Sequence, residues 1–318
     1  MSNNNSNEAK NNEVRLIPYE VLEVAAKITE IPPGVKLVNA PTAWDKSEKG
    51  KDIVVAVIDT GCQTDHVDLK DRIIGGRNFT TDYNSDPNNF SDNAGHGTHV
   101  AGTIAATENN QGVIGVAPLA KLLIVKVLAG NGSGSYEWII NGIKYAVNWR
   151  GPNGEKVRVI SMSLGGKQDV PELHEAVKNA VNNEILVVCA AGNNGDGTPE
   201  IDELSFPGSY QEVVEVGAVD LNKKIARFSE SNKNVDLVAP GVEVWSTYKG
   251  GGYAKLNGTS MATPHVSGGS ALIIKQSEKE FERTLSEDEI YAQLIKRTDA
   301  LGNSKRSEGN GLLDLAKE

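Results

Sequence analysis

Long apolar runs rich in β-branched residues recur along this chain and predict its strands. A strand with one solvent-exposed face alternates apolar and polar residues, whereas an unbroken apolar run is typical of a strand in a parallel sheet that is buried on both faces. Five such runs occur, at residues Ile53–Ile58, Leu122–Leu128, Val157–Ser163, Ile185–Ala190 and Val213–Val219.

Segments of helical pattern lie between these runs, at residues His99–Ala106, Tyr136–Asn148, Pro171–Asn183 and Thr263–Gln276. Strands that alternate with helices imply right-handed crossovers. We therefore predict an α/β fold, a doubly wound and mostly parallel central sheet with helices on both faces. In such sheets the functional residues gather at the carboxyl ends of the strands.

The first 30 residues differ from the rest of the chain. Residues 1–13 are polar and rich in Asn, so we expect them to be disordered. An apolar patch follows from Val14 to Tyr19, and Glu20–Lys27 has the composition of a helix. Because no linker interrupts the remainder, we divide the chain into an N-terminal extension, residues 1–30, and one domain, residues 31–318.

The charge balance bears on partners and location. The 318 residues carry a net charge of -10, whereas a nucleic-acid-binding surface is basic. No run approaches the length of a membrane span, and the N-terminus lacks the basic and apolar regions of a signal peptide. We expect a cytoplasmic protein that binds neither nucleic acid nor membrane, with Cys62 and Cys189 as free thiols.

Three short segments carry an acid, a base and a nucleophile in a fixed order. They are Val-Ile-Asp59-Thr-Gly, Gly-His96-Gly-Thr-His and Gly-Thr-Ser260-Met-Ala. A serine hydroxyl needs a neighbouring imidazole to take its proton, and a carboxylate fixes the tautomer of that imidazole. Alone, Asp59 suggests a turn or helix cap and Ser260 an N-cap. Together, in the order Asp, His, Ser, they predict a serine hydrolase of one class.

Asn193 is the fourth candidate, in the segment Cys-Ala-Ala-Gly-Asn193-Asn-Gly that follows a predicted buried strand. A side-chain amide at the end of a strand can donate a hydrogen bond to the oxyanion of a tetrahedral intermediate. The backbone N–H of Ser260 would be the second donor. His99 and His265 follow motif residues on predicted helices, so we interpret them as packing residues.

The motifs VIDTG, GHGTHVAGT, SMSLGG, AAGNNG and NGTSMATPHVSG resemble those of the subtilisin-type serine proteases. The resemblance runs from about residue 31 to residue 316 and is greatest to the intracellular subtilisins. It implies a serine endopeptidase of broad specificity, acting on protein or peptide substrates, and a homodimer. A catalytically dead relative that only binds peptides is the alternative. A nucleotide-binding α/β domain is set aside, because no phosphate-binding glycine motif follows the first strand.

The resemblance also implies the substrate cleft. An extended peptide would lie between two edge segments and pair with their backbones, the side chains adding apolar pockets. The implied substrate-binding residues are Gly132, Ser133, Gly134, Ser163, Leu164, Gly165, Gly166, Ala190 and Gly192. Tyr136 and Ile139 would shape a second apolar pocket. The primary pocket has no evident charge at its base, which suggests that it accepts large apolar substrate residues. Asp202 and Glu203 could add tolerance for basic substrate residues.

A polar loop in residues 106–113 resembles the high-affinity calcium loop of the same family. The ligands implied are the Asp68 carboxylate, the Asn109 side chain and three backbone carbonyls, those of Thr107, Gln111 and Val113. Calcium favours this mixture of oxygens with limited charge. A further ligand from the N-terminal segment would align with Thr29 or Glu30. A metal-free polar loop is the alternative.

The apolar patch of the extension resembles the short propeptide of the intracellular subtilisins. Leu16, Ile17, Pro18 and Tyr19 would occupy the cleft and block it. Proline fixes φ and lacks an N–H, so Pro18 could hold its peptide bond out of line for attack. The alternative is a disordered leader whose apolar patch packs loosely against the domain.

Overall fold

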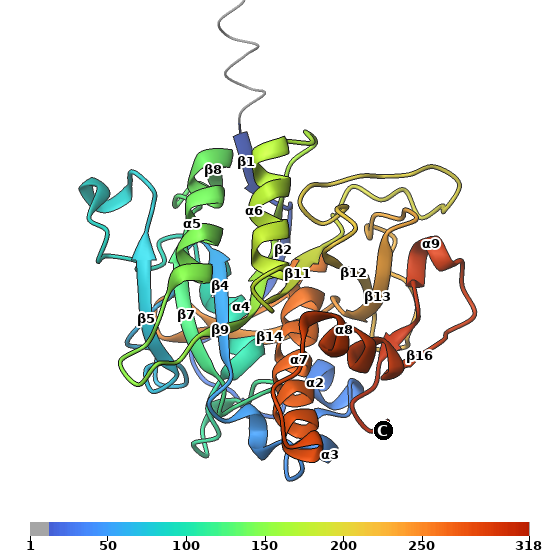
Figure 1. Ribbon diagram of the computed structural model, residues 1–318, viewed down its shortest axis with the longest axis horizontal. Coiled ribbons are helices and arrows are strands. Elements are labelled where there is room, and N and C mark those ends of the chain that lie inside the picture. The colour runs from blue at the N-terminus through green and yellow to red at the C-terminus, as the bar shows by residue number, and fades with distance from the viewer. Residues whose placement is uncertain (1–12, 318) are drawn as a thin grey trace, which may run out of the picture.

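The computed structural model describes residues 13–317, so the expected disorder of the Asn-rich N-terminus concerns residues outside the described range, apart from Glu13. Within that range nine strands form one sheet in the order β16-β17-β13-β12-β11-β9-β4-β7-β5 (Figure 1). Only the β16–β17 pair at one edge is antiparallel. The bounds are β4 Val54–Asp59, β5 Ile73–Asn78, β7 Lys121–Lys126, β9 Val157–Met162, β11 Leu186–Ala190, β12 Val214–Val219, β13 Val235–Pro240, β16 Thr298–Asp299 and β17 Leu312–Leu313.

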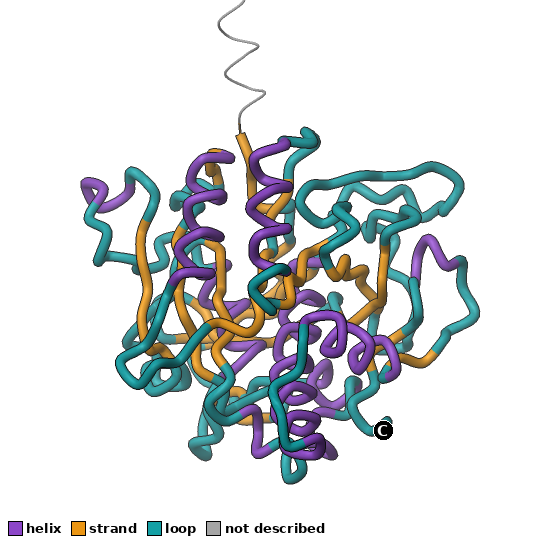
Figure 2. The backbone as a smooth tube through the Cα atoms, in the orientation of Figure 1, coloured by secondary structure: helices purple, strands orange, loops and turns teal. Residues whose placement is uncertain are grey.

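Helices cover both faces of this sheet (Figure 2). The helices α4 and α7 pack with α8 in one hydrophobic core, and α5 and α6 pack in a second core on the other face. Their bounds are α4 His96–Ala105, α5 Tyr136–Asn148, α6 Pro171–Val181, α7 Thr259–Phe281 and α8 Glu287–Lys296. The other helices of the described residues are short, namely α2 Pro33–Leu37, α3 Ala40–Ala43, α9 Lys305–Glu308 and the 3-10 helices η1 Glu48–Gly50 and η2 Asp82–Ser85.

Strand β4 illustrates why the apolar runs are unbroken. Val55 and Val57 belong to the core beneath α4 and α7, whereas Val54, Ala56 and Ile58 belong to the core beneath α5 and α6. Both faces of the strand are therefore dry, and every position can be apolar. The predicted α/β fold is confirmed. The five predicted strands are present, with ends that move by one or two residues.

Two predicted helices begin too late. Helix α4 starts at His96 rather than His99, and α7 starts at Thr259 rather than Thr263 and runs on to Phe281. Gly95 precedes α4 with φ of +108°, a conformation that strains any residue with a side chain. The longer helices place His96 and Ser260 in their first turns.

The N-terminal segment is built into two further sheets. Strand β1, Glu13–Leu16, is antiparallel to both of its neighbours, β8 (Ser133–Ser135) and β10 (Leu164–Gly165). The other sheet has the order β14-β15-β2, with β14 at Val244–Tyr248, β15 at Gly252–Asn257 and β2 at Glu20–Ala25. A short pair, β3 (Thr29–Glu30) and β6 (Gly112–Val113), is parallel.

The helix predicted at Glu20–Lys27 is wrong, because residues Glu20–Ala25 form the strand β2. Backbone pairing with β15, from Glu20 opposite Asn257 to Ala25 opposite Tyr253, supplies hydrogen bonds that helical composition did not reveal. The β-branched Val21 and Val24 also suit an extended chain. Tertiary pairing therefore overrides local propensity here.

Two whole-chain expectations can be compared with the structure. Cys62 and Cys189 are both buried and unpaired, as expected, and burial raises the pKa of each thiol. Across residues 13–317, none of the helices combines the length and the apolar character needed to cross a membrane.

Candidate active site

Asp59, His96 and Ser260 come from three different elements near the carboxyl ends of β4 and β9. Asp59 is the last residue of β4, His96 the first of α4 and Ser260 the second of α7. All three side chains are almost fully buried. The strand–helix order of the sequence therefore delivers an acid, a base and a hydroxyl to one end of the sheet, as the motifs predicted.

The contact between His96 and Asp59 is formed. The Nδ1 atom of His96 lies 2.8 Å from Oδ1 and 3.0 Å from Oδ2 of Asp59. The backbone N–H of Thr60 donates to the same Oδ1 at 2.7 Å and fixes the carboxylate. Because a carboxylate can only accept, the hydrogen of His96 sits on Nδ1, which leaves Nε2 with its lone pair available as a base.

The contact between Ser260 and His96 is not formed in this state. The Ser260 hydroxyl donates instead to the backbone carbonyl oxygen of Ser163, at 3.4 Å. The buried Nε2 of His96 has no hydrogen-bond partner. The ring of Tyr19, from the N-terminal segment, lies with its centroid 4.8 Å from that of His96. His96 and Ser260 are therefore both present but not linked by a hydrogen bond while this segment is in place.

Asn193 lies beside the residue that precedes Ser260. Its Oδ1 accepts from both the backbone N–H and the hydroxyl of Thr259, each at 2.8 Å, and Thr259 directly precedes Ser260. These two bonds fix the orientation of the Asn193 amide and of its nitrogen. That nitrogen donates to the carbonyl oxygen of Pro18 at 2.6 Å. An amide donor thus already holds a peptide carbonyl, the group that becomes an oxyanion in peptide hydrolysis.

The predicted substrate segments flank the N-terminal strand. Val14 pairs with Gly134 on β8, and Leu16 pairs with Leu164 on β10. The N–H of Leu16 also donates to the carbonyl oxygen of Gly132 at 2.9 Å. The remaining predicted substrate residues lie in or beside these segments and the loop after β11, namely Ser133, Ser163, Gly165, Gly166, Ala190 and Gly192. The segment therefore occupies the groove that the sequence assigned to a peptide.

Apolar side chains of the segment are buried in that groove. Val14 has no exposed surface and belongs to the same core cluster as Tyr136 and Ile139, the residues predicted to form a second pocket. Ile17 is 4% exposed and lies near Gly165. Asp202, which could have favoured basic substrate residues, forms an ion pair with Arg306, with Oδ1 2.6 Å from the guanidinium nitrogen. Its charge is therefore already matched within the protein.

The residues predicted to bind calcium are brought together in part. The amide nitrogen of Asn109 donates to Oδ1 of the buried Asp68 carboxylate at 2.8 Å, and the N–H of Val113 donates to Oδ2 at 3.2 Å. The N–H of Thr107 donates to the Asp68 carbonyl oxygen, whereas its buried hydroxyl has no partner. Gln111 is held only through its N–H, by Asn109 Oδ1 at 3.1 Å.

The N-terminal segment also reaches this loop. Thr29 and Glu30 pair with Gly112 and Val113 through β3 and β6. Tyr253, from β15, donates its hydroxyl to Oδ2 of Asp68 at 3.0 Å. Three hydrogen-bond donors, two N–H groups and one hydroxyl, therefore satisfy the Asp68 carboxylate. The Asn109 amide must turn its oxygen toward this carboxylate before the two can share a cation.

The other motif histidines are packing residues. Burial lowers the pKa of His99 to about 3 and that of His265 to about 4, so both rings are neutral at physiological pH. His99 donates from Nε2 to the carbonyl oxygens of Val244 and Ala254, which ties α4 to β14 and β15. His265 bonds the carbonyl oxygen of Met261 within α7.

Sequence reasoning missed Lys126, a fully buried lysine beneath the site. Its ammonium donates to the carbonyl oxygens of Thr60 at 2.7 Å and Leu128 at 3.0 Å, and lies 3.1 Å from Asp82 Oδ2. Burial lowers the pKa of Lys126, while Asp82 raises it. Lys126 pairs with Asp59 across the β4–β7 ladder. A lysine inside the otherwise apolar run Leu122–Leu128 was the available signal.

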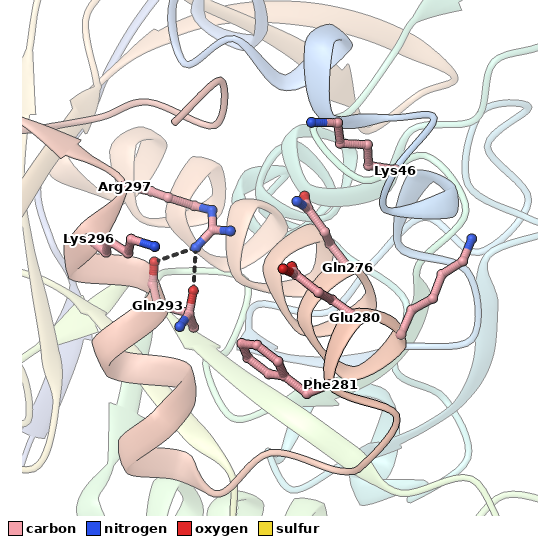
Figure 3. A pocket seen from close by; sticks show the side chains of 8 residues that line it. Lys46, Gln276, Glu280, Phe281, Gln293, Lys296 and Arg297 are labelled. Carbon is pink, nitrogen blue, oxygen red and sulfur yellow. Dashed lines mark hydrogen bonds between the residues drawn. The ribbon is translucent and has the colours of Figure 1, made fainter. Parts of the chain in front are cut away.

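A cavity of about 580 Å³ lies away from these residues, between α7, α8 and the loop that carries Lys46 (Figure 3). Figure 3 shows Arg297 bonded to Gln293 at one side and Phe281 at the other. A second cavity, of about 450 Å³, remains beside the N-terminal segment and is lined by residues 15–19 together with Gly130 and Lys249. The groove is therefore only partly filled by the segment.

The fold, with Asp59, His96 and Ser260 gathered at one end of the sheet, fits a serine peptidase. Residues 50–311 match the model of the subtilase family, and the chain belongs to that family. It is 59% identical to the intracellular serine protease of Paenibacillus polymyxa, over 95% of this chain and 90% of that protein. It is 57% identical to the major intracellular serine protease of Bacillus subtilis, with coverages of 96% and 94%.

Identity to subtilisin DY of Bacillus licheniformis is 42%, over 90% of this chain and 97% of that protein. The chain is therefore a serine endopeptidase, and its substrates are proteins or peptides. A subtilisin-like protein that only binds peptides, the alternative raised from the sequence, is not favoured by these similarities.

Proposed function

We propose that Ser260 is the nucleophile, His96 the general base and Asp59 the residue that orients the base. Once the N-terminal segment leaves, the Ser260 hydroxyl turns from the Ser163 carbonyl to His96 Nε2. His96 takes the hydroxyl proton as the oxygen attacks the peptide carbonyl, and returns it to the departing amine. Asp59 stabilises the imidazolium that exists between these steps. The 2.8 Å contact between His96 Nδ1 and Asp59 supports this assignment.

Asn193 would stabilise the oxyanion of the tetrahedral intermediate, together with the N–H of Ser260. The single observation that carries this proposal is the 2.6 Å hydrogen bond from the Asn193 amide to a peptide carbonyl, that of Pro18. The amide cannot rotate freely, because its oxygen accepts two bonds from Thr259. A donor held in place before the charge develops needs no reorganisation during the reaction.

Substrate would bind as an extended strand between β8 and β10, where β1 now lies. Both neighbours already form antiparallel ladders with β1. Main-chain pairing tolerates many side chains, which favours broad specificity. The apolar surroundings of Val14 and Ile17 favour large apolar residues at two substrate positions.

The segment Leu16–Tyr19 would act as an inhibitory propeptide. Continuing the β1–β10 ladder by one residue sets Ile17 opposite Ser163, the residue whose carbonyl receives the Ser260 hydroxyl. A substrate in this register would offer the Ile17 carbonyl to Asn193, yet Asn193 holds the carbonyl of Pro18. The chain is therefore displaced by one residue at the proline, and the bond that should be cut is out of line.

The inhibitory segment would extend beyond the four residues predicted from the sequence. After Tyr19 the chain continues as β2, which pairs with β15 from Glu20 opposite Asn257 to Ala25 opposite Tyr253. Asn257 lies three residues before Ser260 in the sequence. Strand pairs flank Pro18 in the sequence. Before Pro18, β1 pairs with β8 and β10, and after it, β2 pairs with β15. Residues 13–25 would thus cover the cleft both before and after the bond to be cut.

Calcium would bind at the loop around Asp68 and stabilise the fold, without taking part in the reaction. The Asp68 carboxylate, the Asn109 amide oxygen and the carbonyls of Thr107, Gln111 and Val113 would hold it. The donor chemistry fits, because calcium prefers several uncharged oxygens around few carboxylates. The buried, unpartnered hydroxyl of Thr107 supports a polar site at this position.

A cytoplasmic location and a homodimeric mature enzyme are also proposed. The names of the two relatives at 59% and 57% identity describe intracellular proteases, which supports the location. The homodimer rests on resemblance alone.

A fluorophosphonate probe tests the site and its blockage together, because it reacts only with an activated serine. We expect rapid labelling of Ser260 in protein that lacks residues 1–25 and slow labelling of the full chain. Equal labelling rates would remove the inhibitory role, and no labelling of either protein would indicate a peptide-binding relative without catalysis. Ser260→Ala protein is the matched control.

A further inference from the structure

One residue, Glu230, forms hydrogen bonds with the chain on both sides of Asn193. The backbone N–H of Glu230 donates to the carbonyl oxygen of Gly192 at 3.0 Å, just before Asn193. The Glu230 carboxylate accepts from the backbone N–H of Asn194 at 3.2 Å and from the Asn194 amide at 2.7 Å, just after it. Glu230 therefore binds both neighbours of Asn193, Gly192 through its backbone N–H and Asn194 through its carboxylate.

The fit between Glu230 and this loop is close. Gly192 has φ of +125°, and a Cβ on it would collide with the carboxylate of Glu230. The side chain of Glu230 is fully buried. An isolated buried carboxylate is costly, so its four acceptor contacts, two from Asn194 and two from Lys167, explain how it can stay there.

Lys167 links this carboxylate to the substrate groove. Its ammonium lies 3.1 Å and 3.2 Å from the two carboxylate oxygens of Glu230 and also donates to the Leu204 carbonyl oxygen at 3.0 Å. Lys167 is two residues beyond β10, the strand that pairs with β1. The same carboxylate thus ties the substrate-pairing segment to the loop that carries Asn193.

We propose that Glu230 is a positioning residue that holds the Asn193 amide where the oxyanion forms, with Lys167 as its counter-ion. This inference rests on the proposed oxyanion role of Asn193 and adds the group that fixes the backbone of that residue. Thr259 fixes only the side-chain oxygen of Asn193, so rotation of the loop backbone would still move the nitrogen. Displacement of a donor by a fraction of an ångström weakens transition-state stabilisation more than substrate binding.

The test compares steady-state kinetics of Glu230→Ala and Asn193→Leu, singly and together, in protein lacking residues 1–25. We expect Asn193→Leu to lower kcat by roughly 10²–10³, the size known for subtilisin. Glu230→Ala should lower kcat by about tenfold with KM nearly unchanged, since it acts through one donor. In the Asn193→Leu background Glu230→Ala should lower kcat less than twofold. Glu230→Gln, which keeps an acceptor for Asn194, should recover most of kcat.

Glu308→Ala is the matched control, because Glu308 is equally buried and accepts bonds from the N–H and the amide of Asn303, a loop residue with no proposed role in the reaction. It should lose stability without the selective loss of kcat. If Glu230→Ala does not fold, Lys167→Ala, which removes the counter-ion, provides the same cycle with a smaller effect.

The outcomes separate the two proposals. A tenfold loss that persists in the Asn193→Leu background, or a rise in KM with unchanged kcat, would overturn the role of Glu230 alone. Unchanged kcat in Asn193→Leu would overturn the role of Asn193 and with it that of Glu230.

Discussion

The amide nitrogen of Asn193 lies 2.6 Å from the carbonyl oxygen of Pro18, a residue of the same chain 175 positions earlier. The contact places a peptide carbonyl of the N-terminal segment where a substrate carbonyl is expected, while the Ser260 hydroxyl points to Ser163 instead. The segment therefore resembles a substrate in its strand pairing but differs from one at the bond to be cut.

Replacing Pro18 should convert the segment into a better substrate. Pro18→Ala restores an N–H and frees φ, so the chain can lie flat and offer the Ile17 carbonyl to Asn193. We expect a shorter lag before peptide hydrolysis, with the new N-terminus at residue 18, measured by progress curves and N-terminal sequencing.

Leu16→Ala is the matched comparison for Pro18→Ala. It should also shorten the lag, by weakening the contact of Leu16 with Gly132, but without moving the first cut to the Ile17 bond. An unchanged lag and cleavage site in Pro18→Ala would show that the proline does not protect the segment.

Because β2 also pairs with the domain, we expect truncation of the N-terminal segment to relieve inhibition in two steps. Protein that begins at Glu20 keeps all of β2 and its pairing with β15, whereas protein that begins at Ala26 loses it. We expect the first to start faster than the full chain, but with a higher KM for long peptides than the second. Short peptides that end at the cut bond should not distinguish the two. Identical KM values for long peptides would limit the inhibitor to residues before 20.

Asp59, His96 and Ser260 should behave as one unit. Ser260→Ala should lower kcat by a factor on the order of 10⁶, the size known for subtilisin, and adding His96→Ala should cost little more. Progress curves with a chromogenic peptide measure both variants. Losses that multiply in the double variant would contradict a shared step.

Calcium should stabilise the folded protein, because a ligand that binds only the native state raises its stability by mass action. At a hundredfold excess over Kd the gain is about 2.7 kcal/mol, which is a shift of several degrees in Tm. Asp68→Asn should reduce the difference between Tm in calcium and in chelator. Asn110→Ala, at a neighbouring loop residue outside the proposed ligand set, should leave it intact. Equal Tm values for the unmodified protein in both conditions would remove the site.

The sheet, both helical layers and the position of Asp59 at the end of a strand could be predicted because each depends on local pattern. Strand β4 is dry on both faces, so its sequence is apolar throughout, and Asp59 follows the last apolar residue. Strand β2 could not be predicted, since its hydrogen bonds come from β15, more than 220 residues away. Glu230 was missed for a similar reason, because its partners at 167 and 192–194 meet it only in the fold.

Glu215 should make stability fall as pH rises. It lies in β12, and burial raises its pKa from 4.5 to about 8, partly offset by hydrogen bonds from Asn232 and Ser209. Between these two values the folded state keeps a proton that the unfolded state has lost. The stabilisation of the protonated form is thus fully present below pH 4.5 and is lost as pH rises toward 8.

Glu215→Gln removes this titration, so denaturant unfolding of both proteins from pH 5 to pH 9 provides the measurement. From pH 5 to pH 9, the free energy of unfolding of the variant minus that of the unmodified protein should rise by roughly 2–4 kcal/mol. Any effect of the substitution that does not depend on pH cancels from this change. Ser209→Ala removes a bond that favours the carboxylate, so it should extend the decline to higher pH. A constant difference between Glu215→Gln and the unmodified protein at every pH would show that Glu215 is ionised in the folded state throughout.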